Sequence, residues 1–267
     1  MRKASTNPYL FAGIAIIGVM AGIAVLAPVL SPFNPAAIDQ QSLLAAPSAS
    51  HPMGTDSLGR DLLSRMIYGA RISLSIGLIA VGISVILGVA LGSVAGFYGG
   101  WVDALIMRFA DVMLCFPTFF LILAVVALTE PSIFNIMAII GATSWMGAAR
   151  LVRGEILSLK EREFVQAERA LGASNARIIT VHLIPNALGP VLVHATLGIA
   201  SAILLESGLS FLGLGVQPPV PSWGNILIES KSTLGVAWWI TVFPGMAILL
   251  TILGFNFLSE GLKKIIG

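Results

Sequence analysis

The sequence predicts an all-α integral membrane protein with six membrane-spanning helices. Of its 267 residues, 57% are hydrophobic and 10% are charged, whereas soluble domains carry about 25% charged residues. Apolar runs of the length that a helical span needs, roughly 20 residues, recur along the chain. The predicted spans cover residues 9–30, 72–97, 104–128, 133–149, 186–209 and 238–258.

The first apolar run follows two basic residues, Arg2 and Lys3. A cleavable signal peptide has the same order of charged and apolar residues. The run is long for a signal peptide, and no clear A-x-A cleavage site follows it. We therefore expect residues 1–8 to be a cytoplasmic N-terminus and residues 9–30 to be a retained first helix.

Residues 31–71 are predicted to lie outside the membrane. The first part, residues 31–52, is rich in Pro, Ala and Ser, which predicts an irregular loop. A short helix is expected from residue 56 or 57 to residue 67, and it would lie in the membrane interface before the second span. Its apolar side would be formed by Leu58, Leu62, Leu63 and Met66, with Arg60, Asp61 and Arg65 elsewhere.

Residues 72–267 are expected to form a core of five spans. In the second span Gly88, Gly92 and Gly96 are four residues apart, a pattern that lets helices pack closely, although glycine is frequent in membrane helices generally. Pro117 predicts a kink in the third span. Residues 210–235 are predicted to form an external loop, because proline and glycine interrupt them. An aromatic belt at one membrane surface is expected at Trp223, Trp238 and Trp239.

The longest polar interruption is residues 158–185, within a predicted cytoplasmic loop of residues 150–185. Its pattern predicts two short helices separated by Gly172, with Ser174 as the cap of the second helix. Pro185 is expected to end the segment and open the next span. A loop of this size cannot bury an apolar side on itself, so it lies on the membrane surface or fits into another protein; an ordinary amphipathic loop is the alternative. The apolar side of the first helix is formed by Phe164, Ala167, Ala170 and Leu171.

The basic residues predict an orientation in which both termini and residues 150–185 are cytoplasmic. With six spans, this arrangement places 11 basic residues inside and 4 outside, as the positive-inside rule favours. The inner residues are Arg2, Lys3, Arg108, Arg150, Arg153, Lys160, Arg162, Arg169, Arg177, Lys263 and Lys264, and the outer ones are Arg60, Arg65, Arg71 and Lys231.

The sequence predicts no catalytic, cofactor-binding or metal-binding residue. The phosphate-binding pattern G-x-x-x-x-G-K-[ST] does not occur, so the chain is not expected to bind nucleotide phosphates in the usual way. The one cysteine, Cys115, rules out an internal disulfide and indicates no metal cluster. Nothing resembles the basic surface of a nucleic-acid-binding protein.

Ionisable residues within predicted spans are costly, and each is a candidate for a functional role. Asp111 and Glu206 are therefore candidate pathway residues. Arg108 and Asp111 are also spaced i, i+3, which favours a local salt bridge. Glu206 either faces a transport pathway or lies in a polar interface with a neighbouring helix, and the sequence leaves both open.

The segment VQAERALG, followed after nine residues by HLIPN, resembles the EAA loop of membrane subunits of ATP-binding-cassette importers. In that family the loop docks into a groove of a cytoplasmic ATPase and carries its motion to the membrane helices. Gln166 stands where Glu is usual, and Glu168 where a small residue is usual. The resemblance assigns the ATPase-coupling loop to Gln166, Ala167, Glu168, Arg169, Ala170, Leu171, Gly172, Ala173, Ile184 and Pro185.

Two further stretches resemble the dipeptide, oligopeptide and nickel branch of these importers. Residues 51–74 contain GTD-x-x-GRD-x-x-SR-x-x-x-GAR-x-SL, and the stretch 210–227 resembles the LSFLGLG and P-x-SWG elements of the same branch. The signature positions are Gly54, Thr55, Asp56, Gly59, Arg60, Asp61, Ser64, Arg65, Gly69 and Arg71.

The resemblance implies the type I importer permease fold, with a five-helix core and a peripheral first helix, in the lipid of a bacterial inner membrane. It implies a heterodimer with a second related permease, two cytoplasmic ATPases that carry ATP and magnesium, and an external substrate-binding protein. The implied function is alternating-access uptake of dipeptides, oligopeptides or a related solute such as nickel. The rival hypotheses are a secondary transporter or channel that works without an ATPase, and a membrane enzyme, for which no motif is present.

Overall fold

The computed structural model describes residues 7–233 and 235–266, so Arg2, Lys3 and most of the predicted cytoplasmic N-terminus lie outside the described residues. The described residues form helices, turns and loops, with one isolated β-bridge between Thr55 and Asp61. The α-helices are α1 (Pro8–Val25), α2 (Ala27–Leu30), α3 (Leu62–Tyr98), α4 (Gly100–Leu114), α5 (Thr118–Ala127), α6 (Ile133–Ala142), α7 (Trp145–Leu159), α8 (Glu163–Ala170), α9 (Asn175–Arg177), α10 (Ile184–Phe211), α11 (Trp223–Glu229) and α12 (Trp238–Ile266). A π-helical turn covers Ile178–Leu183 and a 3-10 turn covers Ser230–Ser232.

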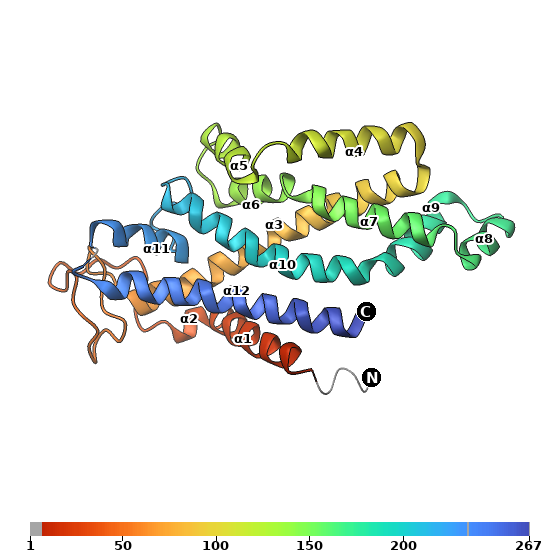
Figure 1. The fold of residues 1–267 in the computed structure, drawn as a ribbon. Coiled ribbons are helices and arrows are strands. Elements are labelled where there is room, and N and C mark those ends of the chain that lie inside the picture. Colours follow the sequence, from red (N-terminus) through yellow and green to blue (C-terminus); the bar gives the residue numbers. More distant parts are fainter. Residues whose placement is uncertain (1–6, 234, 267) are drawn as a thin grey trace.

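The bundle is elongated, and its two ends differ (Figure 1). Helices α1, α3, α4, α7, α10 and α12 run along the long axis, and α8 projects from one end. The loop between α2 and α3 and the short helix α11 lie at the opposite end. The start of α1 and the end of α12 both point towards the α8 end, so these two helix ends and the predicted coupling loop lie at the same end of the bundle.

Within the described residues, four helices are long and apolar enough to cross a membrane: α1, α3, the helix from Asn175 to Phe211, and α12. Helices α4 and α5 pass the same test only together, and they are bent by 84° at a short break. The kink predicted at Pro117 in the third span is therefore confirmed. Pro117 lies at the break, because it has no N–H with which to continue the α4 ladder. The predicted fourth span, 133–149, is divided between α6 and α7, which are separated at Thr143 and Ser144.

The interfacial helix predicted from residue 56 or 57 to residue 67 is absent as a separate element. Helix α3 begins at Leu62 and continues without interruption to Tyr98. Asp61 is its N-cap, and the Asp61 carboxylate accepts a hydrogen bond from the Ser64 N–H at 2.8 Å. Residues 56–60 form a turn before this cap, so the second membrane helix starts ten residues earlier than residue 72, where it was predicted.

The glycine pattern of the second span serves close helix packing. Helix α3 makes its most extensive contact with α7. A Cβ atom added to Gly88 would overlap Ala148, and one added to Gly92 would overlap the Ala149 carbonyl. The interpretation of these glycines as a packing surface is confirmed, and it explains how α7 can pack closely against α3.

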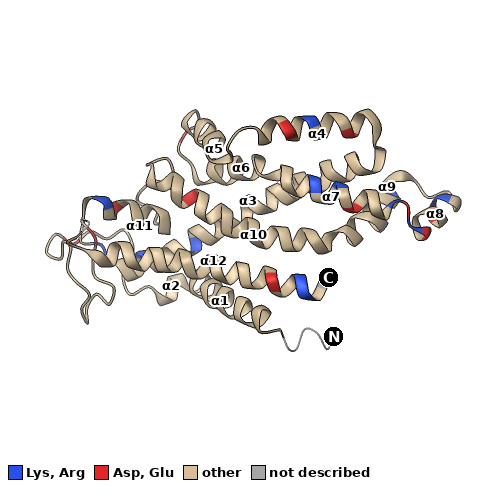
Figure 2. Cartoon of the chain, viewed as in Figure 1, with Lys and Arg blue, Asp and Glu red and all other residues tan. Residues whose placement is uncertain are grey.

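The first helix lies at the edge of the bundle, along α12 and α3. Only 11% of its span is buried within the chain, compared with 33% for α3. Its peripheral position agrees with the expected fold. Charged residues are sparse on the long helices and gather on α8 and its neighbours and near α11 (Figure 2).

Candidate functional site: a coupling loop and an ion-pair network

Helix α8 ends at Ala170, two residues before Gly172, the residue at which the sequence predicts a break. Gly172 has φ +79°, a conformation that glycine adopts without the penalty of a Cβ atom. The N–H groups of Gly172 and Ala173 donate hydrogen bonds to the carbonyls of Arg169 and Glu168, both at 3.0 Å. This pair of bonds is the Schellman arrangement that closes a helix C-terminus. The chain therefore leaves the axis of α8 at a defined point.

Ser174 caps the next helix, as predicted, because its side chain accepts a hydrogen bond from the Arg177 N–H at 3.4 Å. Pro185 stands in the first turn of α10, as predicted, but the second helix of the loop does not end before it. Helix α9, the π-helical turn and α10 form one continuous helix from Asn175 to Phe211. The wide π-helical turn comes directly before Ile184 and Pro185, where the missing proline N–H would interrupt a regular ladder. The loop is thus joined directly to the membrane helix.

The apolar side predicted on α8 is uncovered in the described part of the chain. Phe164 is 41% exposed and Leu171 is 83% exposed, and Ala167 and Ala170 are exposed beside them. Val165 alone turns inward, where it is fully buried in a cluster with the π-helical turn. Helix α8 therefore buries one apolar side chain and presents the rest of its apolar surface outward.

Polar contacts fix α8 relative to the helices behind it. Glu168 Oε1 lies 3.5 Å from His182 Nε2 on the π-helical turn, an ion-pair distance rather than a good hydrogen bond. The Arg169 guanidinium lies 5.6 Å above the ring of Phe97 at the end of α3. The Lys160 ammonium donates to the Gly96 carbonyl at 3.1 Å. Two of the predicted coupling residues, Glu168 and Arg169, are therefore connected to the π-helical turn before α10 and to the end of α3.

At the opposite end of the bundle, Asp56 organises the signature turn. Its Oδ1 accepts hydrogen bonds from the N–H groups of Leu58 and Arg60, at 2.8 and 2.9 Å. Gly59 in this turn packs directly against the Asp39 carbonyl, where a side chain would not fit. The N–H of Gln41 and the hydroxyl of Ser42 hydrogen-bond the Asp39 carboxylate and lower its pKa. The turn and the preceding loop are thus folded onto each other.

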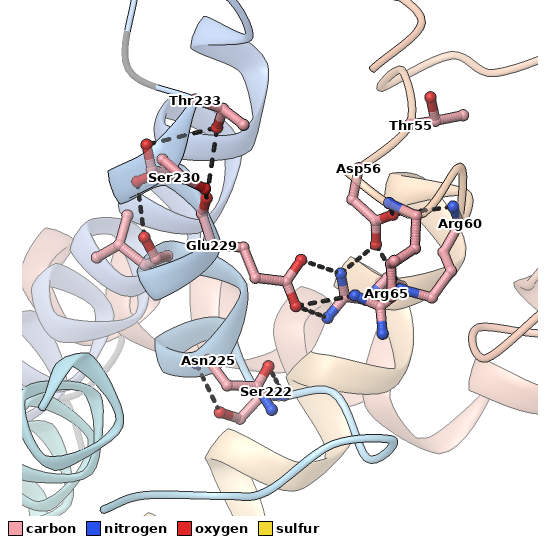
Figure 3. A network of polar contacts seen from close by, with 12 residues as sticks. Thr55, Asp56, Arg60, Arg65, Ser222, Asn225, Glu229, Ser230 and Thr233 are labelled. Carbon is pink, nitrogen blue, oxygen red and sulfur yellow. Dashed lines mark hydrogen bonds and ion pairs between the residues drawn. The ribbon is translucent and has the colours of Figure 1, made fainter. Parts of the chain in front are cut away.

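Four charged side chains form a network beside this turn (Figure 3). Asp56 Oδ2 accepts a hydrogen bond from Arg60 Nε at 2.7 Å and also pairs with Arg65. Glu229, at the end of α11, accepts from Arg65 Nη1 and Nη2 at 2.6 and 2.7 Å and from Arg60 Nη2 at 2.9 Å. Asp56 and Arg65 are almost completely buried. Two carboxylates balance two guanidinium groups, as a buried cluster requires.

Two tryptophans predicted for an aromatic belt are instead buried near the network. Trp223 is 1% exposed and its indole N–H donates to the Met66 carbonyl at 3.1 Å. Trp239 is 5% exposed and its indole N–H donates to the Thr55 carbonyl at 3.0 Å. Trp238 is 55% exposed, in keeping with the prediction. Each indole ring has one N–H donor, and in both residues it bonds a backbone carbonyl. The two rings can therefore be buried away from the membrane–water interface.

Most other signature residues lie in the same region. The Thr55 hydroxyl accepts a hydrogen bond from the Ala45 N–H at 2.8 Å. Asp61 Oδ1 lies 2.9 Å from His51 Nδ1. Gly69 is in close contact with Trp223 of α11. Gly54 begins the turn with φ +76°. Arg71 is separate from this group: it lies further along α3, in a cleft beside α1.

Glu206 on α10 contacts the end of the bundle that contains α11. Its Oε1 accepts hydrogen bonds from the hydroxyls of Ser210 and Ser222, at 2.7 and 2.9 Å. Ser222 is the N-cap of α11, where it forms a capping box with Asn225. Of the two positions open for Glu206, the structure places its carboxylate in the interface with a neighbouring helix, and a role in the pathway stays a prediction. Among the described residues Asp111 pairs with Arg150 of α7, so the predicted pair with Arg108 is wrong.

Two features of this site escape the sequence reasoning. Glu229 is not singled out there, although two arginines in an apolar region require nearby carboxylates. The pattern Ser222–Asn225 is a capping signal that could have located the start of α11. Within residues 7–233 and 235–266, no group of three His, Cys, Asp or Glu side chains is placed to hold a metal ion.

Solved structures identify the class of this fold. The chain superposes on the inward-facing MetNI methionine ABC transporter with a TM-score of 0.56, over 77% of this chain and 98% of that chain, at 16% identity. An amino acid ABC transporter gives a TM-score of 0.54 over 74% of this chain and 93% of that chain, at 15% identity. The fold is therefore the type I fold of ABC importer permeases.

Sequence comparison identifies the family. Residues 88–267 match the model of the binding-protein-dependent transport system inner membrane component. The chain is 43% identical to the dipeptide transport system permease protein DppC of Alkalihalophilus pseudofirmus, over 98% of this chain and 86% of the relative. It is 41% identical to the oligopeptide transport system permease protein OppC of Haemophilus influenzae, over 98% and 85%. The chain belongs to this family of binding-protein-dependent inner membrane permeases.

Proposed function

We propose that this chain forms one half of the membrane pathway of an ATP-driven importer of dipeptides or oligopeptides. The observation that carries the proposal is the uncovered apolar side of α8, which the turn at Gly172 joins to a helix that runs without a break from Asn175 to Phe211. The relatives named for dipeptide and oligopeptide transport support peptides as the cargo; a related solute such as nickel is the alternative.

The long helix offers a mechanical route between the two ends of the bundle. From Asn175 to Glu206 it rises roughly 45 Å, at about 1.5 Å per residue. Glu206 holds the cap of α11 through Ser222, and α11 ends at Glu229 in the ion-pair network. A displacement of α8 by a closing ATPase would therefore reach α11 at the opposite end. Alternating access would follow, with ATP binding opening the pathway outward and hydrolysis returning it inward.

A cavity of about 810 Å³ is the proposed contribution of this chain to the pathway. It lies where helices are interrupted: Thr118 follows the bend between α4 and α5, and Thr143 and Ser144 separate α6 from α7. Ser201 and Ser207 of α10 add hydroxyl groups to otherwise apolar walls. Such a surface offers hydrogen bonds to a peptide backbone without binding a charge strongly, which suits passage rather than retention.

The family implies ATPase and substrate-binding partners, and the finer arrangement belongs to the proposal. A second, related permease would complete the pathway as a heterodimer. Two cytoplasmic ATPases, which would carry ATP and magnesium, would cover α8, and an external binding protein would face α11. The start of α1, the end of α12 and α8 lie towards one end of the bundle (Figure 1), which supports a cytoplasmic position for all three under the positive-inside rule.

Reconstitution tests this function against a secondary transporter or channel. The complete importer would be placed in proteoliposomes with its binding protein, and uptake of a labelled dipeptide would be measured with ATP inside. We expect uptake that requires both ATP and the binding protein and that stops when the ATPase carries a substitution of its phosphate-binding lysine. Uptake at an equal rate without ATP would overturn the proposal and favour the secondary transporter.

A further inference from the structure

A cleft of about 300 Å³ lies between the end of α1 and the first half of α3. The α1 wall is formed by Ala21, Ala24 and Val25, and the α3 wall includes Leu74 and Leu78. These side chains are apolar. The polar side chains of the cleft are those of Arg71 and Ser75, both on α3.

Arg71 differs from the other arginines at the start of α3. Arg60 and Arg65 are both paired with Asp56 and Glu229. Arg71 is exposed, and it forms no ion pair or hydrogen bond with any residue that the structure describes. Its guanidinium presents five N–H donors, which are costly to leave without acceptors beside apolar side chains.

The depth of the cleft places Arg71 near a membrane surface. Helix α1 has 18 residues and rises about 27 Å, close to the roughly 30 Å thickness of the hydrocarbon core. The cleft is lined by the last turns of α1, which point towards the end of the bundle that contains the signature turn. Arg71 thus lies at the level of the lipid headgroups, and Leu78 lies two turns deeper in the hydrocarbon.

We propose that this cleft binds one phospholipid, whose phosphate is held by Arg71. A guanidinium matches the oxygens of a phosphate with two parallel hydrogen bonds, and an acyl chain would follow Leu74 and Leu78. Lipid is favoured over a carboxylate of a second subunit because α1 borders the cleft and exposes Ile14, Val19 and Val25 by 53, 60 and 76%. Such a surface on the outermost helix suits contact with lipid. A lipid in this position would brace α1 against α3.

Native mass spectrometry of the complete importer tests the site. The complex would be delipidated in detergent and titrated with phosphatidylglycerol. We expect the first lipid adduct to fall at least about fivefold in Arg71→Gln and to persist in Arg71→Lys, because both cations bind phosphate. Arg108→Gln is the matched control: Arg108 is exposed on α4, and its removal should leave the adduct unchanged. Ala21→Phe narrows the cleft without removing a charge and should also displace the lipid.

Equal adducts in the wild type and Arg71→Gln would overturn the proposal. So would loss of the second permease from the Arg71→Gln complex with the lipid adduct intact, since Arg71 would then serve a protein carboxylate. If Arg71→Gln failed to assemble, the decision would rest on Ala21→Phe: an unchanged adduct there would also overturn the site.

Discussion

Arg65 and Glu229 are 164 residues apart in the sequence, and their side chains meet in two parallel hydrogen bonds of 2.6 and 2.7 Å. The pair connects the first turn of α3 to the last residue of α11. It joins the signature stretch to the loop between the last two spans, which sequence reasoning treats as separate elements. The opposite end of the molecule is organised differently, around the exposed helix α8.

Loss of the Glu229 charge is expected to destabilise the fold. In Glu229→Gln, Asp56 would be the one remaining carboxylate of the network for both Arg60 and Arg65. The Arg65 side chain is 2% exposed, so water cannot replace the lost partner. Removing one partner from a buried ion cluster costs about 3 kcal/mol. Thermal unfolding of the purified protein in detergent should show a clearly lower midpoint. Glu260→Gln removes an exposed partner of Lys263 and should change stability by no more than about 1 kcal/mol. Equal shifts for the two variants would count against the network.

Gly172→Val is expected to uncouple ATP hydrolysis from uptake while the subunit remains inserted. A side chain at φ +79° costs roughly 1–2 kcal/mol and more for a β-branched residue, so the link between α8 and α9 should adopt another shape. Uptake and ATPase activity in proteoliposomes measure the effect. Gly154→Val serves as control, because Gly154 has open space around it and no left-handed backbone. Normal uptake by Gly172→Val at normal abundance would contradict the lever role of the loop.

Two glycines of α3 provide a matched test of helix packing. Gly92→Leu would force α3 away from the Ala149 carbonyl of α7, at a cost of about 1–3 kcal/mol for overpacking. Gly82→Leu places the same side chain in open space on the same helix. We expect Gly92→Leu to reduce the thermal stability or membrane abundance of the protein and Gly82→Leu to have little effect. Similar losses in both would contradict the packing role of Gly92, because Gly82 makes no contact with α7 and leucine favours a helix more than glycine does.

The contact between Glu168 and His182 is expected to contribute to coupling. Uptake rates of Glu168→Ala, His182→Ala and the double variant form a double-mutant cycle. Because the pair is partly exposed, its interaction energy should be about 0.5 kcal/mol. The uptake rate of the double variant should then differ roughly twofold from the rate expected if the two single effects were independent. The same cycle with Glu163, at the start of α8, should show no interaction. An equal interaction in both cycles would assign the effect to α8 as a whole.

Local patterns predicted the features that depend on a few neighbouring residues. Gly172 and Ser174 were identified correctly, because a positive φ and an N-cap are determined within one turn. The glycines facing α7 were also predicted, since a four-residue spacing fixes a helix face. The fold class followed from the apolar runs, because each has roughly the 20 residues that a membrane-spanning helix needs.

Contacts between distant segments could not be predicted in the same way. Arg60 and Arg65 were expected on the polar side of an interfacial helix. The sequence did not show that Glu229, more than 160 residues away, would pair with them and allow them to be buried. Trp223 and Trp239 were expected at the membrane surface. They are buried because their indole N–H groups bond backbone carbonyls of remote segments, which the sequence does not reveal. Two helix boundaries were also wrong. Asp61, rather than residue 56 or 57, caps the helix that begins at Leu62. The π-helical turn before Pro185 keeps the helix continuous where a proline was expected to interrupt it.

Site-directed crosslinking tests the central claim most directly. Single cysteines at Ala170 and Asn175, both exposed, would be introduced into a Cys115→Ser background in the assembled importer, and crosslinked proteins would be identified by mass spectrometry. Docking of α8 into an ATPase predicts crosslinks from both positions to a protein with a phosphate-binding loop. Crosslinks only to lipid, or none, together with solute transport that persists after ATP depletion, would contradict the coupling role of this loop.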